Sequence, residues 1–405
     1  MTRLRRPAVL VLVCVCASVA LTPAAQSRSV PSRIADTAYW TMVQELSEEG
    51  GSFPSNNFVS NETEFQTVIP RLMTTVKPGG VYVGVGPDQN FTYIAALRPS
   101  IAFIVDIRRQ NAMHHLLYKA LMELSPTRAD FIARLFARPR PANLDVNAPP
   151  RAIFEAVADV LPDSELWTKH LVEVFDRLER HHKFTLTPAD RTMIQFVYEA
   201  FAIRGPEISY SSAPVASTYI FGSDRIVRTM PYPTFAALMT TTDSAGMNRA
   251  YLASEANYKI IRDMQLRNLI VPVVGDFAGP TALRGVGAWV AAHKSTVTAF
   301  YTSNVEQYLF QNGVWKHYYD NVAAMPLDDT STFIRAHFVS SGVLVDRILS
   351  REMVPRTDPF FNPQFRGVSR SVSLLCSVRE LLLDLRERKR RVLRVELNSP
   401  TLFAG

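Results

Sequence analysis

The chain has 405 residues, of which 47% are hydrophobic and 20% are charged, and its formal net charge is +7. This composition excludes a largely disordered chain, and the length suits one large domain or two ordinary ones. The positive excess is modest, so we expect no nucleic-acid partner.

The N-terminus has the layout of a secretory signal peptide. Three arginines stand within the first six residues, an apolar run covers 8–21, and Pro23-Ala24-Ala25 supplies small residues for cleavage before Gln26. The apolar run is too short to span a bilayer comfortably. We therefore expect residues 1–25 to be removed and the protein to be periplasmic or extracellular. The alternative is an uncleaved N-terminal anchor.

A helix is expected over 36–46, followed by a polar, turn-rich patch that ends at Ser60 and Asn61. Either of these two residues can cap a second helix through 65–72. Lys77-Pro78-Gly79-Gly80 then stops this region before the first strand.

The next segment reads as a strand, a glycine turn, a helix and a second strand that ends in an acid. The first strand, 81–85, is short and β-branched, as buried parallel strands are. Gly84 and Gly86 allow a tight turn and a close approach of a ligand, and a helix starting near Pro87 directs its free N–H groups at that turn. Asp106 stands about 20 residues further on, where an acid can bind ribose hydroxyls. The alternative is a strand–turn–helix that holds no ligand.

Residues 125–266 are expected to form a mostly helical insertion between the second and third strands. A helix over 109–124 precedes it, and Ser125-Pro126 begins the next one with proline in its first turn. Further helices are predicted near 151–160, 164–181, 188–204 and 245–267, with an irregular or extended stretch over 205–230.

The sheet pattern resumes with a strand over 269–274, which Gly275-Asp276 closes. Pro272 inside this strand predicts some irregularity or a local break in pairing. A helix over 280–293 and strands over 296–301 and 333–339 follow. Strands that alternate with helices predict an α/β fold with a doubly wound, mostly parallel sheet, formed by residues 36–124 and 267–400.

The tail from Ser369 is predicted to be a helix that ends in the basic run 386–391, with a last extended piece over 392–397. We interpret the basic run as a solvated helix end, where cations suit the helix dipole. Contact with phosphate groups or anionic lipid is the alternative.

Cysteine and histidine usage predicts no metal site. Cys376 is the one cysteine beyond the signal segment, so neither a disulfide within the mature chain nor a cysteine zinc site is expected. His114-His115 and His181-His182 are adjacent pairs. Neighbouring residues on a helix point in different directions, so neither pair is a chelate by itself.

Four positions fall at or just after predicted strand ends, namely Gly86, Asp106, Asp276 and Asn304. Because ligands of such sheets bind outside the carboxyl ends of the strands, we expect these residues to share one site. Tyr301, Asn304 and Glu306 are candidate catalytic residues there, with Glu306 as a general base or amine ligand and Asn304 orienting an acceptor. The alternative is that Ser303 or Asn304 caps the next helix.

These motifs support a family resemblance. Gly84-Val85-Gly86, Asp106 and Gly275-Asp276 stand in the order found in class I S-adenosylmethionine-dependent methyltransferases, which the chain resembles. The resemblance implies that the glycine turn lies by the methionine part of S-adenosylmethionine, that Asp106 binds ribose and that Asp276 lies by adenine.

Two phrases extend the resemblance. Val-Gly-Pro-Asp-Gln-Asn-Phe-Thr-Tyr-Ile (85–94) and Ser-Asn-Val-Glu-Gln-Tyr-Leu (303–309) are similar to an uncharacterised family of exported bacterial proteins with a methyltransferase-like fold. The implied function is binding of S-adenosylmethionine or a related nucleoside, with no methyl acceptor named.

The chain departs from the superfamily at two positions. Tyr82 stands where an acid is usual, and Asp88 occupies the third glycine position. Asp88 is therefore a further candidate cofactor contact, which would either repel the cofactor's carboxylate or bind its ammonium group. These departures, together with export to a compartment where S-adenosylmethionine is not expected to be abundant, favour a second hypothesis. In that hypothesis the chain is an exported binding or structural protein that keeps the fold without the reaction.

Other chemistries are less well matched. A dinucleotide oxidoreductase would need a glycine where Gln89 stands. The sequence contains neither a G-x-x-x-x-G-K-[ST] phosphate loop nor a G-x-S-x-G nucleophile elbow.

Overall fold

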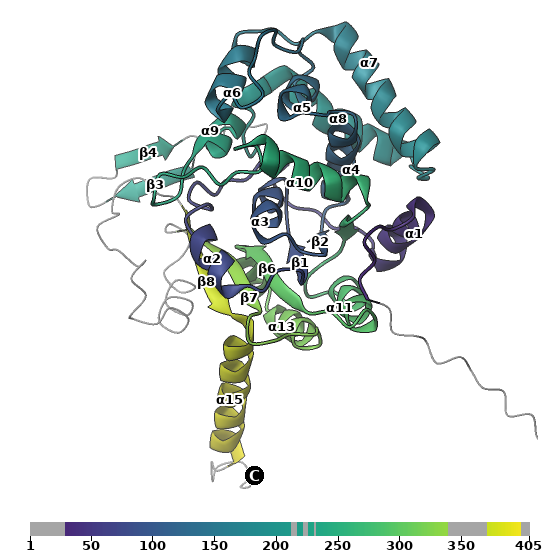
Figure 1. Cartoon of the computed structure of the whole chain (residues 1–405). Coiled ribbons are helices and arrows are strands. Elements are labelled where there is room, and N and C mark those ends of the chain that lie inside the picture. The colour runs from purple at the N-terminus through teal and green to yellow at the C-terminus, as the bar shows by residue number, and fades with distance from the viewer. Residues whose placement is uncertain (1–28, 212–216, 222–225, 231, 339–370, 398–405) are drawn as a thin grey trace, which may run out of the picture.

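A six-stranded sheet forms the centre of the described molecule, in the order β5-β2-β1-β6-β7-β8 (Figure 1). Neighbouring strands from β5 to β7 pair in parallel, and β8 pairs antiparallel with β7. After β1 the chain adds β2 and β5 on one side of β1, and it then adds β6 and β7 on the other side. The strand order therefore reverses between β1 and β6. The bounds are β1 Val81–Gly84, β2 Ile101–Asp106, β5 Ile270–Val274, β6 Val297–Ser303, β7 Thr332–Phe338 and β8 Ser371–Ser377. The predicted α/β class and mostly parallel sheet are confirmed.

The structure is a computed structural model that describes residues 29–211, 217–221, 226–230, 232–338 and 371–397. The predicted signal peptide, 1–25, lies outside the described residues.

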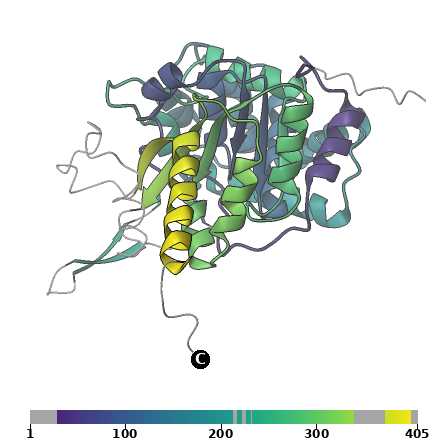
Figure 2. The ribbon, with the colours of Figure 1, turned by 90° about the horizontal axis from the view of Figure 1, so that it is seen from below.

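Helices cover both faces of the sheet (Figures 1 and 2). One face carries α3, α4 and α10, and the other carries α11 and α13. Their bounds are α3 Gln89–Leu97, α4 Arg109–Glu123, α10 Glu255–Leu266, α11 Ala282–Ala292 and α13 Trp315–Ala323; α1 is Asp36–Leu46, α2 Ile69–Thr75 and α12 Val305–Gln311. Among the described residues, no helix has the length and apolarity needed to cross a membrane.

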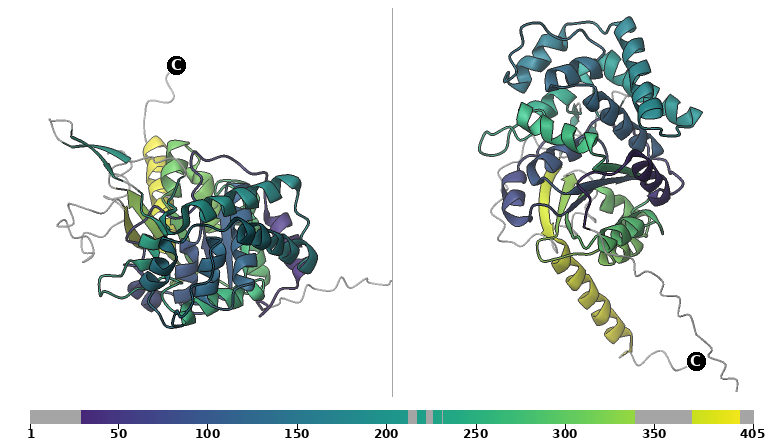
Figure 3. Two further views of the ribbon diagram at one scale, coloured as in Figure 1. Left: turned by 90° about the horizontal axis from the view of Figure 1, so that it is seen from above. Right: turned by 45° about the vertical axis from the view of Figure 1, so that its right-hand side comes forward.

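The chain between β2 and β5 is mostly helical, as expected, and most of it lies beyond the α3–α10 layer (Figure 3). It contains α5 Arg128–Leu135, α6 Pro150–Ala158, α7 Ser164–Phe175, the π-helix η1 Asp176–His181, α8 Pro188–Arg204, the short 3-10 helix η2 Gly205–Glu207, the ribbon β3 Ser217–Phe221 with β4 Ile226–Met230, and α9 Phe235–Thr240. Buried apolar residues of this region and of the sheet belong to one continuous hydrophobic core.

Helix starts follow capping residues, and this corrects three predictions. Thr127 forms a capping box with Asp130, so α5 begins after Thr127 and not at Ser125. Ser254 caps α10, which is therefore shorter than the helix predicted from 245. Neither Ser60 nor Asn61 caps α2, because that helix starts only at Ile69.

Two predictions about the sheet were wrong. Pairing of β5 with β2 is continuous through Pro272, because β5 is an edge strand and its free side needs no ladder N–H. The tail is not helical from Ser369, since 371–377 form β8 before α15 (Val378–Leu397) extends away from the sheet (Figure 3). The predicted extended piece over 392–397 is the end of α15.

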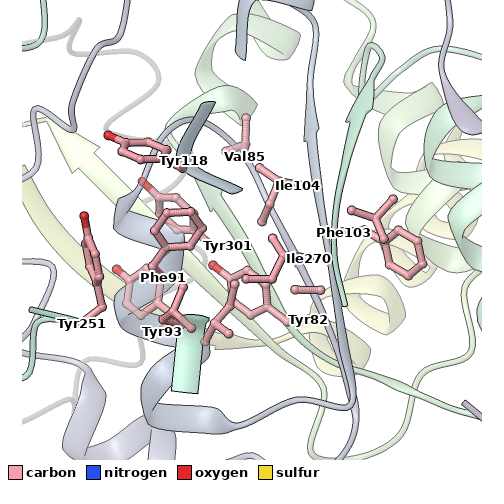
Figure 4. Close-up of a cluster of buried hydrophobic side chains, with 14 of the residues drawn as sticks. Tyr82, Val85, Phe91, Tyr93, Phe103, Ile104, Tyr118, Tyr251, Ile270 and Tyr301 are labelled. Carbon is pink, nitrogen blue, oxygen red and sulfur yellow. The ribbon is translucent and has the colours of Figure 1, made fainter. Parts of the chain in front are cut away.

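An aromatic cluster packs between the sheet and the α3–α10 layer (Figure 4). The ring of Phe91 meets Tyr118 and Tyr251 at centroid distances of 5.5 and 5.4 Å. Tyr93 meets Tyr301, on β6, at 5.2 Å. Such edge-on and tilted pairs fix ring orientation as well as burying area. Packing of the Tyr301 ring against Tyr93 therefore fixes the position of the Tyr301 hydroxyl.

Candidate functional site

A cavity of about 320 Å³ lies at the carboxyl ends of β1, β2, β5 and β6. Its position is the reversal of strand order between β1 and β6, where doubly wound sheets bind ligands, and its volume suits a small molecule. The strand ends contribute Val85, Gly86, Pro87, Asp106, Ile107, Arg108, Gly275, Asp276, Phe277, Tyr301, Ser303 and Asn304. Five of the eight site residues predicted from sequence therefore share this cavity: Gly86, Asp106, Asp276, Tyr301 and Asn304.

Residues 48–62, which we call the covering segment, contribute much of the remaining wall. The Glu48 N–H donates to the Val274 carbonyl over 2.8 Å, and the Gly51 N–H donates to the Ile107 carbonyl over 2.7 Å. These bonds tie the segment to the ends of β5 and β2. The polar, turn-rich composition noted in the sequence thus corresponds to a chain that crosses the strand ends.

Gly84 is required by packing inside the protein. Tyr82 donates its hydroxyl to Asn90 Oδ1 over 2.9 Å, and Asn90 Nδ2 donates to the carbonyls of Val85 and Pro87. A Cβ on Gly84 would lie 1.9 Å from Asn90 Oδ1. Gly84 does not line the cavity, so its glycine is explained by the Tyr82–Asn90 contact that holds the turn.

Gly86 does line the cavity, and it adopts φ +77°, a conformation that favours glycine. Its carbonyl accepts a hydrogen bond from His115 Nε2 over 2.9 Å. Burial lowers the pKa of His115 to about 4, so the ring is neutral and its Nε2 carries the donated proton. The predicted glycine turn is therefore held by a hydrogen bond from α4.

Asp106 is buried at the cavity but already has a partner. Arg108 donates to Asp106 Oδ1 through its backbone N–H (2.9 Å) and Nε (3.1 Å), and to Oδ2 through Nη2 (2.9 Å). A carboxylate offers two acceptor positions on each oxygen, so Oδ1 is saturated and Oδ2 retains one. Arg108 also donates to the Asn56 carbonyl of the covering segment. The sequence indicated Asp106 as a ribose acceptor but did not reveal this pairing.

Asp276 and Asn304 are half-buried and line the cavity. The Ala278 N–H donates to Asp276 Oδ1 over 2.9 Å. Asn304 occupies the N-cap position of α12, yet its side chain makes no capping hydrogen bond. The capping role considered for Asn304 is therefore wrong, and its side chain instead forms hydrogen bonds with Ser303 and Tyr308.

Two predicted site residues lie elsewhere. The carboxyl group of Asp88 is buried and accepts the Tyr251 hydroxyl over 3.1 Å, and burial raises its pKa to about 7. Glu306 accepts Arg335 Nη2 and the Tyr319 hydroxyl, each over 2.7 Å. Neither residue lines the cavity, so neither the Asp88 contact nor the Glu306 base expected from the sequence is placed to meet a ligand there.

Glu62 is a cavity residue that the sequence did not reveal. It ends the covering segment, is 1% exposed, and accepts the Tyr301 hydroxyl (2.7 Å), Ser303 Oγ (2.5 Å) and Gln89 Nε2 (2.8 Å). Burial raises the pKa of Glu62, although these three donors oppose the shift. An acid at the end of a turn-rich patch has no sequence signal that separates it from solvated surface acids.

The charge of the cavity is unbalanced. Of its lining residues that the structure describes, Glu62, Asp106 and Asp276 carry carboxyl groups, and Arg108 is the single cation. Since Arg108 is paired with Asp106, two carboxyl groups are left without a cationic partner in the lining. A cavity of this kind is unfavourable for phosphate-rich ligands, such as dinucleotides, and favourable for cationic ones.

His114, His115 and His182 are part of the packed interior, whereas His181 is exposed. His114 stacks on Tyr118 at a centroid distance of 4.5 Å, and His182 Nε2 lies 2.7 Å from Glu123 Oε2. Within the described ranges, no group of three or more His, Cys, Asp or Glu side chains is arranged to hold a metal ion.

A family model matches most of the residues that form the sheet and the cavity. A family model described as a domain of unknown function, DUF7790, matches residues 57–352. No curated relative matches the chain. The matched range contains Glu62 and all four strand ends at the cavity. It also contains the 85–94 and 303–309 phrases, and both phrases contribute residues to the cavity lining. The match spans more than half of the 405 residues, and the chain therefore belongs to the DUF7790 family.

Proposed function

We propose that this protein binds S-adenosylmethionine, or a closely related nucleoside, in the strand-end cavity. The observation that carries the proposal is that Gly86, Asp106, Asp276 and Asn304, which follow four different strands, line one cavity. The strand order supports it, because the parallel strands, counted along the chain, lie in the order 3-2-1-4-5 of doubly wound nucleotide-binding sheets. On this proposal the fold is the methyltransferase-like variant that the sequence resembles.

The lining residues fit the parts of such a ligand. Asp106 Oδ2 retains one acceptor position, which suits one ribose hydroxyl. Asp276 offers an acceptor for an adenine amino group, beside the apolar side chains of Phe277, Val305 and Leu309. Two unbalanced carboxyl groups suit a ligand with a positive charge, and they make the dinucleotide alternative a poor fit.

S-adenosylmethionine supplies an activated methyl group on a sulfonium centre. Of the three candidate catalytic residues, Tyr301 and Asn304 line the cavity, and we propose that an acceptor would be oriented by them. The Tyr301 hydroxyl donates to Glu62, so this pair can hold or move a proton at the Tyr301 oxygen.

A second candidate is an exported binding protein without methyl transfer. The specific observation in its favour is that Glu306, the expected base, is buried with Arg335 and lies outside the cavity lining. Binding without formation of S-adenosylhomocysteine, in the presence of a broad set of acceptors, would select this candidate over the first.

Calorimetric titration of residues 26–405 with S-adenosylmethionine and S-adenosylhomocysteine tests the proposal. We expect binding in the wild type and a loss of about tenfold or more in Asp106→Ala, because a hydrogen bond to a charged group is removed. No heat with either ligand, from protein with a cooperative unfolding transition, would overturn the proposal.

A double variant separates binding from folding. Asp106→Ala alone leaves the buried Arg108 guanidinium without its partner, which is costly to stability. Asp106→Ala with Arg108→Met removes both members of the pair and restores the charge balance. Stability should recover in the double variant while ligand affinity stays low. Recovery of affinity together with stability would show that Asp106 only supports the fold.

We also propose that the mature protein is exported and begins at Gln26. Mass measurement of the protein recovered from the periplasm or medium of a bacterial host tests this. An intact N-terminus in the membrane fraction would instead identify an anchor.

A further inference from the structure

The free hydrogen-bonding capacity of Glu62 can be counted. Its Oε1 accepts both the Tyr301 hydroxyl and Ser303 Oγ, which fills the two acceptor positions of that oxygen. Its Oε2 accepts Gln89 Nε2, which leaves one position open. Three neutral donors thus hold the carboxyl group in place, and none of them is a cation. In the described part of the chain, no cationic side chain forms an ion pair with Glu62.

The backbone around Glu62 is strained where it faces the cavity. Ser303, whose hydroxyl binds Glu62, has φ +51°, and the pairing of β6 with β7 shifts register beside it. A left-handed conformation is unfavourable for a residue with a Cβ, and such strain is common at ligand sites. Asn57, also in the lining, has φ +47°, and its Oδ1 is buried without a hydrogen-bond partner. Glu62 and Asn57 therefore both present hydrogen-bond acceptors, and a ligand with hydrogen-bond donors would satisfy them.

We infer that Glu62 recognises the positively charged group of the bound ligand, with Tyr301 and Ser303 positioning its carboxylate. This inference rests on the proposed function and adds to it the location of the ligand's cationic end. Asp106 and Asp276 would then face the ribose and base, and Glu62 the sulfonium or ammonium group. Glu62 is a specificity-determining residue on this account, because a neutral ligand would leave its charge buried and uncompensated.

The affinity for a cationic ligand should depend on the ionisation of Glu62. Burial raises the pKa of this carboxyl group, and the surrounding titratable groups are Tyr82, Tyr93 and Tyr301. Burial also raises the pKa of each tyrosine, so all three stay neutral where Glu62 titrates. Affinity for a cationic ligand should therefore increase with pH as Glu62 loses its proton. The same pH dependence should be absent from Glu62→Gln.

The test uses three ligands that differ in charge. S-adenosylmethionine carries a sulfonium and an ammonium group, S-adenosylhomocysteine carries the ammonium group only, and 5′-methylthioadenosine carries neither. Each is titrated calorimetrically into the wild type and Glu62→Gln, residues 26–405. We expect Glu62→Gln to weaken S-adenosylmethionine binding by about 10–100-fold where Glu62 accepts from the ammonium group, the range for a charge-assisted hydrogen bond, and to leave methylthioadenosine unaffected.

The outcomes separate the two proposals. A loss confined to S-adenosylmethionine places the sulfonium at Glu62, and an equal loss for S-adenosylhomocysteine places the ammonium there; both support the inference. Equal losses for all three ligands, or no loss for any, would overturn it while leaving the proposed function intact. Failure of the wild type to bind any of the three overturns the proposed function and this inference with it.

Ser303→Ala tests the positioning role. It removes one hydrogen bond to Glu62 but keeps the carboxylate, so the preference for charged ligands should weaken less than in Glu62→Gln. Glu62→Asp keeps the charge on a shorter side chain and should recover part of the preference. Thermal unfolding of each variant shows whether a lost preference merely reflects a lost fold.

Discussion

Two buried polar regions of this protein use charge in opposite ways. The first is the strand-end cavity around Glu62. The second, which we call the Lys119 cluster, consists of Asp36, Lys119, Glu123, His182 and Asn268, and it joins α1, α4 and the chain after α10. Both regions are polar and largely buried, yet only the first lines a cavity.

Every donor of the Lys119 ammonium group is used. It donates to Glu123 Oε1 (2.7 Å), the Gln265 carbonyl (2.5 Å) and Asn268 Oδ1 (2.6 Å). Burial opposes ionisation of Glu123, but hydrogen bonds from His182 and Lys119 hold its pKa below the ordinary value. The comparison teaches that this chain compensates buried charge where charge serves the fold. No cation of this kind pairs with Glu62 at the cavity in the described part of the chain, and the proposed ligand would supply one.

The largest effect is expected when the compensated region is broken. Lys119→Met should lower the free energy of unfolding by about 3–5 kcal/mol, because it leaves Glu123 and two other acceptors buried without their donor. Urea unfolding measures this. Asp263→Asn, which breaks the exposed pair with Arg267, is the control and should change stability by less than about 1 kcal/mol. Similar changes in the free energy of unfolding of the two variants would show that the buried Lys119 cluster contributes no more to stability than an exposed ion pair.

A smaller effect, with a defined pH dependence, is expected at Asp88, an acid buried outside both regions. Burial raises its pKa in the folded state to about 7, from an ordinary value of 3.8. The folded protein thus binds this proton more tightly than the unfolded chain does, and the stability that the proton confers is lost as pH rises through about 7. Asp88→Asn should therefore stabilise the protein by roughly 2–4 kcal/mol at about pH 8 and by roughly 1–2 kcal/mol at about pH 5, with little effect only below the ordinary pKa of 3.8.

The quantity to compare is the variant minus the wild type at each pH. Burial lowers the pKa of His114 and His115, and these groups give the wild type a slope of the opposite sign. They are present in both proteins and cancel in the difference. A difference that does not change with pH would show that Asp88 does not titrate in this range.

The smallest effect on stability is expected at Asp276, in the uncompensated region. Asp276→Asn keeps the oxygen that accepts the Ala278 N–H, so the free energy of unfolding should change by less than about 0.5 kcal/mol. Affinity for S-adenosylmethionine should nevertheless fall by about 2–12-fold, the equivalent of one hydrogen bond. Calorimetry and urea unfolding of the same preparation test both parts. A large loss of stability with unchanged affinity would place Asp276 with the structural charges.

Much of the fold was predictable from the sequence, because the signals for it are local. The helix predicted over 188–204 is confirmed as α8, which begins with a complete capping box between Thr187 and Asp190. The apolar runs that became β1, β2 and β5 were identified as parallel strands because they are buried on both faces. The predicted start of α10 was misplaced because the residues just before Ser254 form turns, although their sequence pattern also suits a helix.

The sequence by itself determined which residues stand at the ends of the strands, because strand order along the chain and the positions of glycine and acid are local facts. Only the tertiary structure decided which of them face the cavity. Asp88 and Glu306 are turned into the protein by Tyr251 and Arg335, partners far along the chain. Glu62 reaches the cavity only because the covering segment brings it to Tyr301, 239 residues away. The direction of a side chain after a strand depends on such distant partners, and no local pattern records them.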